Sequence, residues 1–195
     1  MISTADAVLV VEKDAIFQKL IDVNFIKTMK IEREISLILI SGRGYPDINT
    51  RKMVKHMAKT LKIPVLCITD ADPHGAEIML TYRFGPRLSS QETVGINCPN
   101  LHWLALLPSD LAKAPIRTSL VMSDRDFRKL KRLQNRECVR WNTELANELE
   151  SMQAGGRKAE LESLSDTDLL TLLQDRIFSC LHPKKEKENA AMDQS

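Results

Sequence analysis

The chain has 195 residues, which is enough for one substantial domain with or without a helical extension. Hydrophobic residues make up 43% and charged residues 28% of the sequence, and these shares are ordinary for a soluble globular protein. The formal net charge of +2 excludes a global basic field, so any contact with nucleic acid must come from local patches.

The chain begins with an apolar run followed by an amphipathic segment. Residues 7–11 (AVLVV) are continuous and β-branched, which is typical of a strand buried on both faces of a parallel sheet. A helix is predicted next, with Asp14 as its N-cap and with Ile16, Leu20 and Val23 on one face.

The same alternation continues through the next segments. A second strand is predicted at 35–41, and it ends in a turn rich in glycine and proline at 42–47. The apolar spacing then predicts a helix over 48–62 and a third strand over 65–69, which stops at the acidic loop 70–75.

A third helix is predicted over 75–84 and a fourth strand over 101–107. Strands that alternate with helices are typical of a parallel sheet with right-handed crossover connections. The sequence therefore predicts an α/β fold, a Rossmann-like parallel sheet flanked by helices.

The character of the sequence changes beyond about residue 123. Residues 124–153 and 157–179 are predicted to be helical without clear strands, and Ser165 with Asp168 resembles a capping box. The polar composition from residue 183 onward predicts disorder. These boundaries divide the chain into an α/β domain at 1–123, a helical C-terminal part at 124–182 and a disordered tail at 183–195.

No apolar run approaches the roughly 20 residues that a membrane helix needs, and the first residues show no signal-peptide pattern. The four cysteines lie far apart without a CxxC pair, which argues against a zinc site and against disulfides. We therefore expect a soluble intracellular protein that does not associate with membranes.

Three acidic residues follow two of the predicted strands. Glu12 comes directly after the first strand, Asp70 directly after the third, and Asp72 lies in the same loop. Sites in open parallel sheets form outside the carboxyl ends of the strands, so these carboxylates converge if the two strands are neighbours. Converging carboxylates repel one another, and a hard divalent cation such as Mg²⁺ resolves that repulsion.

A less specific interpretation stays open. Acidic residues after strands often cap helices, and Asp-x-Asp occurs often by chance. Two details favour the cation site. Pro73 makes a rigid turn that preorganises the two aspartates, and Glu12 is a charge at the end of an apolar strand, which is costly without a partner.

The sequence resembles a known family at this point. Four segments carry the likeness in order, namely VEKDA at 11–15, GRGYPD at 42–47 followed by Thr50-Arg51, DADPHG at 70–75 and WLALLPSD at 103–110. Together they resemble the Toprim domain of the topoisomerase VI A subunit family, and most of all its eukaryotic members that make the double-strand breaks initiating meiotic recombination. The resemblance covers roughly residues 7–150.

The resemblance implies a mechanism. In that family a tyrosine on a winged-helix domain attacks a DNA phosphate and becomes joined to the 5′ end, while the Toprim domain of the partner protomer supplies the metal. Carried over by position, Glu12, Asp70 and Asp72 are the Mg²⁺ ligands, and Glu12 is also a general acid or base towards the leaving 3′ oxygen. The resemblance further implies DNA binding, a homodimer, location in the nucleus and a partner that resembles the B-type topoisomerase VI subunit.

The chain departs from the family pattern because the winged-helix domain is expected before the first strand, where this chain begins. Of its two tyrosines, Tyr45 lies in the glycine turn and Tyr82 in the third helix, and packing is the expected role of each. The chain is then a fragment or isoform, and it need not cleave DNA alone. Two alternatives are a catalytically inactive module for DNA binding and dimerisation, and a small Toprim nuclease that uses metal-activated water.

Basic residues near the acidic loop are candidates for DNA contact. Arg43 and Arg51 flank the glycine turn and His74 follows the aspartates. The alternative interpretations are exposed loop arginines paired with Asp47 and a loop histidine that helps to start the third helix. A moderately basic helix face is predicted around Arg128, Lys131 and Arg132, although such a face is more often merely solvated. Core packing is the expected role of Trp103 and Trp141.

Overall fold

The computed structural model describes residues 3–87, 95–113 and 119–183, without the side chains of residues 112 and 113. The tail that was expected to be disordered, 183–195, lies outside the described residues except for its first member. Within the described part, no helix has the length and apolar character needed to cross a membrane.

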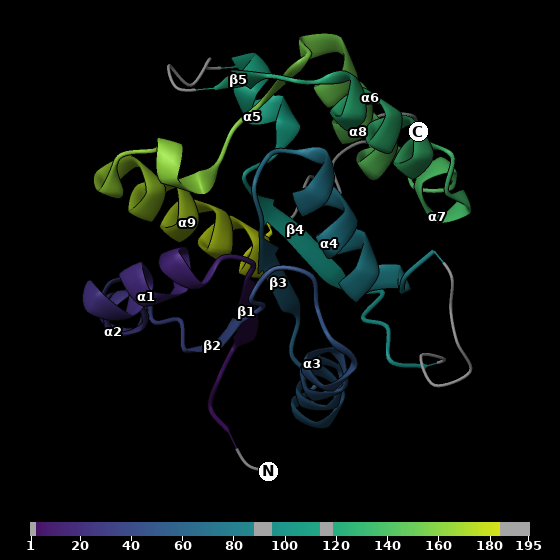
Figure 1. Ribbon diagram of the computed structural model, residues 1–195. Helices are drawn as coiled ribbons and strands as arrows, with labels where there is room; N and C mark the ends of the chain where they lie inside the picture. Colours follow the sequence, from purple (N-terminus) through teal and green to yellow (C-terminus); the bar gives the residue numbers. More distant parts are fainter. Residues whose placement is uncertain (1–2, 88–94, 114–118, 184–195) are drawn as a thin grey trace, which may run out of the picture.

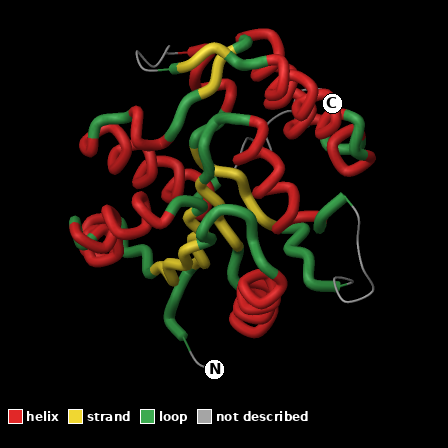
Figure 2. The backbone as a smooth tube through the Cα atoms, viewed as in Figure 1, coloured by secondary structure: helices red, strands yellow, loops and turns green. Residues whose placement is uncertain are grey.

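Four parallel strands form the central sheet in the order β2-β1-β3-β4. They are β1 (Ala7–Val11), β2 (Leu37–Ser41), β3 (Val65–Ile68) and β4 (Leu101–Ala105). The predicted α/β fold with a parallel sheet is confirmed, and Figure 2 shows the yellow strands surrounded by red helices. Because β1 lies between β2 and β3, its carboxyl end borders the ends of both neighbours.

Helices cover both faces of this sheet (Figure 1). One face carries α3 (Ile48–Leu61) and α4 (Pro73–Phe84), and the other carries α1 (Asp14–Asp22), α2 (Phe25–Glu32) and α9 (Asp166–Leu181). Alternate side chains of β1 join the two cores on opposite faces, and every residue of the strand is buried. This two-sided burial explains why the strand reads as a continuous apolar run.

The start of the chain after β1 differs from expectation in two ways. Asp14 is the first residue of α1 and not its N-cap, because Lys13 takes the extended cap conformation. The helix then ends before Val23, which is 38% exposed, and the left-handed Asn24 begins the unpredicted helix α2. The segment predicted as one amphipathic helix is thus followed by a second helix, and Phe25 occupies the core position that was expected for Val23.

The C-terminal part packs against both cores. It follows α5 (Pro108–Lys113) and β5 (Leu120–Val121), and it begins with α6 (Asp124–Gln134), α7 (Glu137–Arg140), α8 (Thr143–Gly155), β6 (Arg157–Lys158) and the short 3₁₀ helix η2 (Leu161–Ser163). The expectation of no strands here was wrong, since β5 and β6 pair antiparallel. Strands of two residues are too short to show a periodic pattern.

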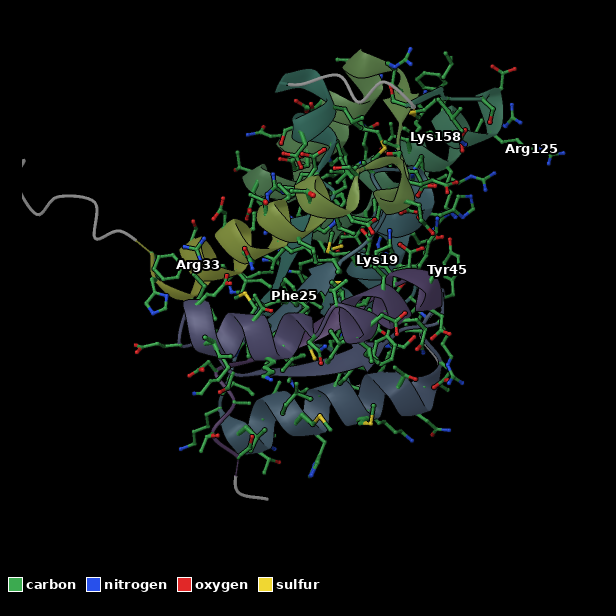
Figure 3. All side chains as sticks on the ribbon, turned by 90° about the vertical axis from the view of Figure 1, so that its left-hand side faces the viewer. Lys19, Phe25, Arg33, Tyr45, Arg125 and Lys158 are labelled. Carbon is green, nitrogen blue, oxygen red and sulfur yellow. The ribbon has the colours of Figure 1, made fainter. Side chains whose placement is uncertain are left out.

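The helix α9 follows η2 and returns to the main sheet. Ser165 caps it as expected, because its hydroxyl accepts a hydrogen bond from Asp168 N. Two ion pairs join α9 to the helices beneath it, Lys19 with Asp166 at 2.6 Å and Arg33 with Asp175 at 2.8 Å. Both basic side chains are labelled on the face shown in Figure 3.

The two tryptophans have opposite environments. Trp103 is 7% exposed, and its indole N–H donates to the hydroxyl of Thr69 at 2.9 Å, which confirms its role in the core. Trp141 is 88% exposed, so the expected core role was wrong for it. It lies directly after α7, a helix of one turn that buries Val139 instead.

Asp126 joins α6 to β6. Its Oδ2 accepts hydrogen bonds from the backbone N–H and the hydroxyl of Ser123, both at 2.8 Å, and pairs with Lys158 Nζ at 2.9 Å. Burial acts to raise the pKa of Asp126, but Lys158 and the hydrogen bonds outweigh it and lower the pKa to about 2.

We expect the substitution Asp126→Asn to lower the free energy of unfolding by about 2 kcal/mol at roughly pH 6. A carboxylate whose pKa is lower in the folded chain stabilises the fold above its unfolded pKa, and this contribution disappears as the pH falls towards 2. Urea unfolding of the parent and the variant should therefore show a difference in the free energy of unfolding that becomes smaller in acid. An equal difference in the free energy of unfolding near neutral pH and in acid would contradict the lowered pKa of Asp126.

Candidate metal centre

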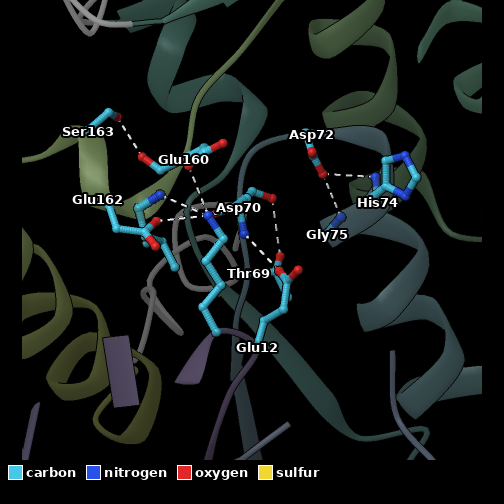
Figure 4. A network of polar contacts seen from close by, with 11 residues as sticks. Glu12, Thr69, Asp70, Asp72, His74, Gly75, Glu160, Glu162 and Ser163 are labelled. Carbon is cyan, nitrogen blue, oxygen red and sulfur yellow. Dashed lines mark hydrogen bonds and ion pairs between the residues drawn. The ribbon is translucent and has the colours of Figure 1, made fainter. Parts of the chain in front are cut away.

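The carboxyl ends of β1 and β3 bring two acidic side chains together. The parallel register aligns Val11 with Ile68, so Glu12 and Asp70 follow neighbouring strands at the same edge. The backbone N–H of Asp70 donates to Oε2 of Glu12 at 3.1 Å (Figure 4). The convergence of these two residues that the sequence predicted is therefore present.

Both carboxylates are buried, and their pKa values respond to it. Glu12 is 8% exposed, and burial together with the charge of Asp70 raises its pKa to about 7. Asp70 is 5% exposed, and burial raises its pKa as well, although the N–H of Leu161 and the ammonium of Lys13 act in the opposite direction. A buried negative charge of this kind favours a nearby cation.

Asp72 lies in the same loop but faces the first turn of α4. Its Oδ1 accepts hydrogen bonds from the backbone N–H groups of His74 at 2.8 Å and Gly75 at 2.7 Å, so it is the N-cap of this helix. The helix therefore begins at Pro73, two residues before the predicted start. Figure 4 shows Asp72 apart from the Glu12–Asp70 pair.

The ammonium of Lys13 occupies the centre of the acidic cluster. Its Nζ lies 2.9 Å from Asp70 Oδ2, 3.0 Å from Glu160 Oε2 and 2.9 Å from Glu162 Oε2. The two glutamates come from the segment after β6, whose Leu161 N–H also donates to Asp70 Oδ1 at 2.8 Å. The sequence predicted none of these three contacts of Lys13, because Asp70, Glu160 and Glu162 all lie far from the lysine along the chain.

The donor set matches a hard divalent cation in chemistry and charge, since it consists of carboxylate oxygens around one positive group. Within the described residues, however, no three acidic, histidine or cysteine side chains converge on a single point as a metal ion requires. Lys13 takes one oxygen of Asp70, and Asp72 uses Oδ1 as a helix cap. The residues fit an ion if the ammonium withdraws and Asp72 turns its second oxygen towards the pair.

A cavity of about 500 Å³ opens beside this cluster. Asp72, Lys158, Glu160 and Glu162 are among the residues that line it. The cluster is thus accessible from solvent on the side of the C-terminal part, although Glu12 and Asp70 themselves are buried.

Neither tyrosine offers a hydroxyl that is both exposed and free of a hydrogen-bond partner in the described structure. The Tyr45 hydroxyl donates to Glu77 Oε2 at 2.5 Å, accepts from Lys129 Nζ at 2.9 Å and lies 3.0 Å from His74 Nδ1. Burial and the charge of Glu77 raise the pKa of Tyr45, so the phenol stays protonated. Tyr82 is 1% exposed, and its hydroxyl has no hydrogen-bond partner among the described residues.

The structure separates the basic residues that were predicted to contact DNA. Arg43 lies in the neighbouring glycine turn and His74 in the acidic loop itself, and both are exposed. Arg128, Lys131 and Arg132 are exposed on α6. Arg51 is 3% exposed, and its guanidinium donates to Asn97 Oδ1 at 3.1 Å inside the fold. This burial leaves Arg51 without a surface to offer DNA. Asp47 caps α3 through Thr50 and pairs with neither arginine in the described structure.

Comparisons with known proteins agree with this architecture. A family model described as the Toprim domain of the topoisomerase 6 A subunit and Spo11 matches residues 7–179. The chain is 39% identical over 167 residues to the meiotic recombination protein SPO11 of Homo sapiens, covering 85% of this chain and 41% of that protein. It is 36% identical to SPO11-1 of Arabidopsis thaliana, covering 85% of this chain and 45% of that protein. It is 32% identical to the A subunit of DNA topoisomerase 6 from the same plant, covering 85% and 38%. The chain thus spans less than half the length of these relatives.

Proposed function

Because the chain belongs to the Toprim family of the topoisomerase 6 A subunit and Spo11, we propose that it is the Toprim part of a protein that makes the DNA double-strand breaks of meiotic recombination. The observation that carries this proposal is the meeting of Glu12 and Asp70 at the carboxyl ends of neighbouring strands, with Asp72 in the same loop. Ligands of open parallel sheets bind at this edge. Relatives named as meiotic recombination proteins and a relative named as part of a DNA topoisomerase support DNA strand breakage as the chemistry.

The proposed ligands of Mg²⁺ are Glu12, Asp70 and Asp72. When bound, the ion stabilises negative charge on the phosphate and on the leaving oxygen. Asp70 would hold the ion through the carboxylate that now pairs with Lys13, and Asp72 would hold it through the oxygen that does not cap α4. Glu160 and Glu162 would still hold the ammonium of Lys13 if Asp70 bound the ion.

Glu12 is the proposed general acid or base for the leaving 3′ oxygen. In the site without an ion its pKa is raised to about 7 by burial and by the charge of Asp70, so its carboxyl group can take up or release a proton near neutral pH. Such a group can give and accept a proton under the same conditions, and a reversible transesterification needs both steps. The hydrogen bond from Asp70 N–H holds Glu12 Oε2 in place and leaves Oε1 for this role.

We propose that exposed basic side chains hold the DNA backbone near this edge. Arg43 and His74 border the acidic loop, and α6 lies beside the first turns of α4, where Lys129 pairs with Glu77. The α6 side chains that extend the contact are Arg128, Lys131 and Arg132. Lysine and arginine bind phosphates with release of counterions, so this term is independent of DNA sequence.

The proposal extends to assembly and location. A protein that breaks both strands of a duplex needs two acidic loops, which supports a homodimer with one loop for each strand. The relative whose name designates it the A component of topoisomerase 6 supports a B-type component of that enzyme among the further partners. The names of the meiotic relatives support the nucleus as the compartment, because that is where chromosomal DNA lies.

A second candidate function is a module that binds DNA and metal but lacks a nucleophile of its own. The environments of the two tyrosines favour it, since Tyr82 is buried and the Tyr45 hydroxyl is engaged by Glu77 and Lys129. A nucleophilic tyrosine then has to come from another segment or another chain.

The test is incubation of the purified chain with supercoiled DNA and Mg²⁺, followed by gels with and without protease. We expect intact DNA from this chain alone, because neither tyrosine is positioned for attack. We also expect protein-linked 5′ ends when a chain carrying the winged-helix tyrosine is added. Protein-free ends produced by this chain alone would instead establish a metal-dependent nuclease and overturn the proposal.

A further inference from the structure

A cavity lies at the edge of the sheet opposite the acidic loop. Its volume is about 700 Å³, and it is bordered by the last turns of α3 and α4 and by the amino ends of β3 and β4. Parallel strands place their amino ends at the edge away from the carboxyl ends, so this cavity is separate from the candidate metal centre. None of the residues assigned above to metal or DNA lines it.

The lining of this cavity carries an excess of positive charge. Its basic residues are Lys55, Lys59, Lys62, Arg83 and His102, and no described lining residue carries a carboxylate. In the described part of the chain, none of these side chains takes part in an ion pair. Burial and the charge of Arg83 lower the pKa of His102, against the opposing charge of Glu144, which favours the neutral imidazole and leaves the three lysines and Arg83 as the cations of the lining.

The geometry of the cavity combines a basic rim with an apolar floor. Lys59 and Lys62 are exposed at the rim, whereas Val65 and Leu101 are 2% and 1% exposed at its base. Arg83 is fixed at one side because its Nε donates to Pro99 O at 3.0 Å, which leaves the other guanidinium nitrogens for a ligand. Further apolar lining comes from Ala58, Ile63 and Pro64.

We propose that this cavity binds an acidic segment of a partner protein, with one apolar side chain of the segment on the floor and carboxylates on the rim. Charge complementarity favours an anionic partner, since several cations surround the opening without an acidic neighbour in the lining. An apolar anchor in a pocket surrounded by polar contacts is the usual arrangement of a peptide-binding site. Duplex DNA presents phosphates on a convex surface and has no apolar side chain to fill such a floor, so the peptide fits better.

The test is fluorescence anisotropy with a labelled peptide of glutamate and serine that contains one central leucine. We expect saturable binding that weakens with salt, and a loss of roughly tenfold or more in the variant Lys55→Gln, Lys59→Gln, Arg83→Gln. The matched control is Lys27→Gln, Lys30→Gln, Arg125→Gln, which removes the same charge from exposed positions outside the cavity and should bind the peptide as the parent does. Replacing the leucine of the peptide by serine should also weaken binding.

Three results would overturn the proposal. They are an absence of measurable peptide binding by the parent chain, equal binding by the cavity variant, and equal binding of the peptide without leucine. A double-stranded oligonucleotide serves as the competing ligand. If the cavity variant loses oligonucleotide binding and keeps peptide binding, the site is one for nucleic acid. Circular dichroism of both variants verifies that they are folded, which is expected because the changed side chains lie at the surface or the rim.

Discussion

Asp70→Asn should weaken binding of Mg²⁺ by more than about 100-fold, beyond the roughly 10- to 100-fold loss that follows from removing a group that merely orients a ligand. The amide is similar in size to the carboxylate but carries no charge. It therefore removes one of the two buried anions that meet at the sheet edge. Isothermal calorimetry of the parent and the variant measures the difference directly.

The matched control is Glu160→Gln. This glutamate also contacts the Lys13 ammonium, at 3.0 Å, but it is not a proposed ligand. We expect the affinity of this variant for Mg²⁺ to stay within about tenfold of the parent, because Glu160 acts on the proposed ligand Asp70 only through Lys13. Equal losses in both variants would show that total negative charge, and not a specific ligand set, determines binding. Failure of the parent chain itself to bind the ion would refute the idea that its own residues suffice.

The second large effect is expected at Gly75, in the first turn of α4. A Cβ at this position would lie 2.3 Å from the carbonyl oxygen of Asp70 and 3.0 Å from the hydroxyl of Thr69. The hydroxyl is held by the indole of Trp103, so neither neighbour can move without disturbing the core. We expect Gly75→Ala to lower the free energy of unfolding by about 3 kcal/mol, at the upper end of the usual cost of overpacking.

Urea unfolding measures this loss, and Gly155→Ala is the natural comparison. Gly155 is the last residue of α8, and a Cβ there would meet nothing within 4 Å. Alanine at such a position should stabilise the chain by about 0.4–1 kcal/mol. If Gly75→Ala unfolds at the same urea concentration as the parent, the close approach of α4 to the acidic loop is not as tight as described.

The sequence predicted the parts of the fold that leave a local pattern. The apolar runs of β1, β2, β3 and β4 identified the strands within about two residues. Burial on both faces excludes polar side chains from β1 and β3, whereas β2 is half-buried in part and β4 carries the exposed His102. The position of Glu12 and Asp70 after two strands then placed them at one edge. Whether those strands are neighbours is not a local property, and the structure supplied it.

Other features depend on contacts that no local pattern records. Lys13 meets Glu160 although 147 residues separate them, and the basic character of Arg51 gave no sign that it is buried. Trp141 shows the reverse case, because its large apolar side chain suggested a core position and is 88% exposed. The break between α1 and α2 depends on the left-handed backbone conformation of Asn24. Asparagine tolerates this conformation, but its presence in a sequence does not predict it.

The contacts of the acidic loop with the segment after β6 bear on how the molecule is made. Asp70 receives its hydrogen bond from Leu161, 91 residues later, so this contact can form only after Leu161 has been synthesised. Contacts between distant residues carry a larger entropic cost of closure and slow the folding of a domain. The four strands can pair while the last third of the chain is still on the ribosome. We therefore expect the nascent protein to pass through a stage in which the four strands are paired, while Asp70 lacks its hydrogen bond from Leu161 and Lys13 lacks its ion pairs with Glu160 and Glu162.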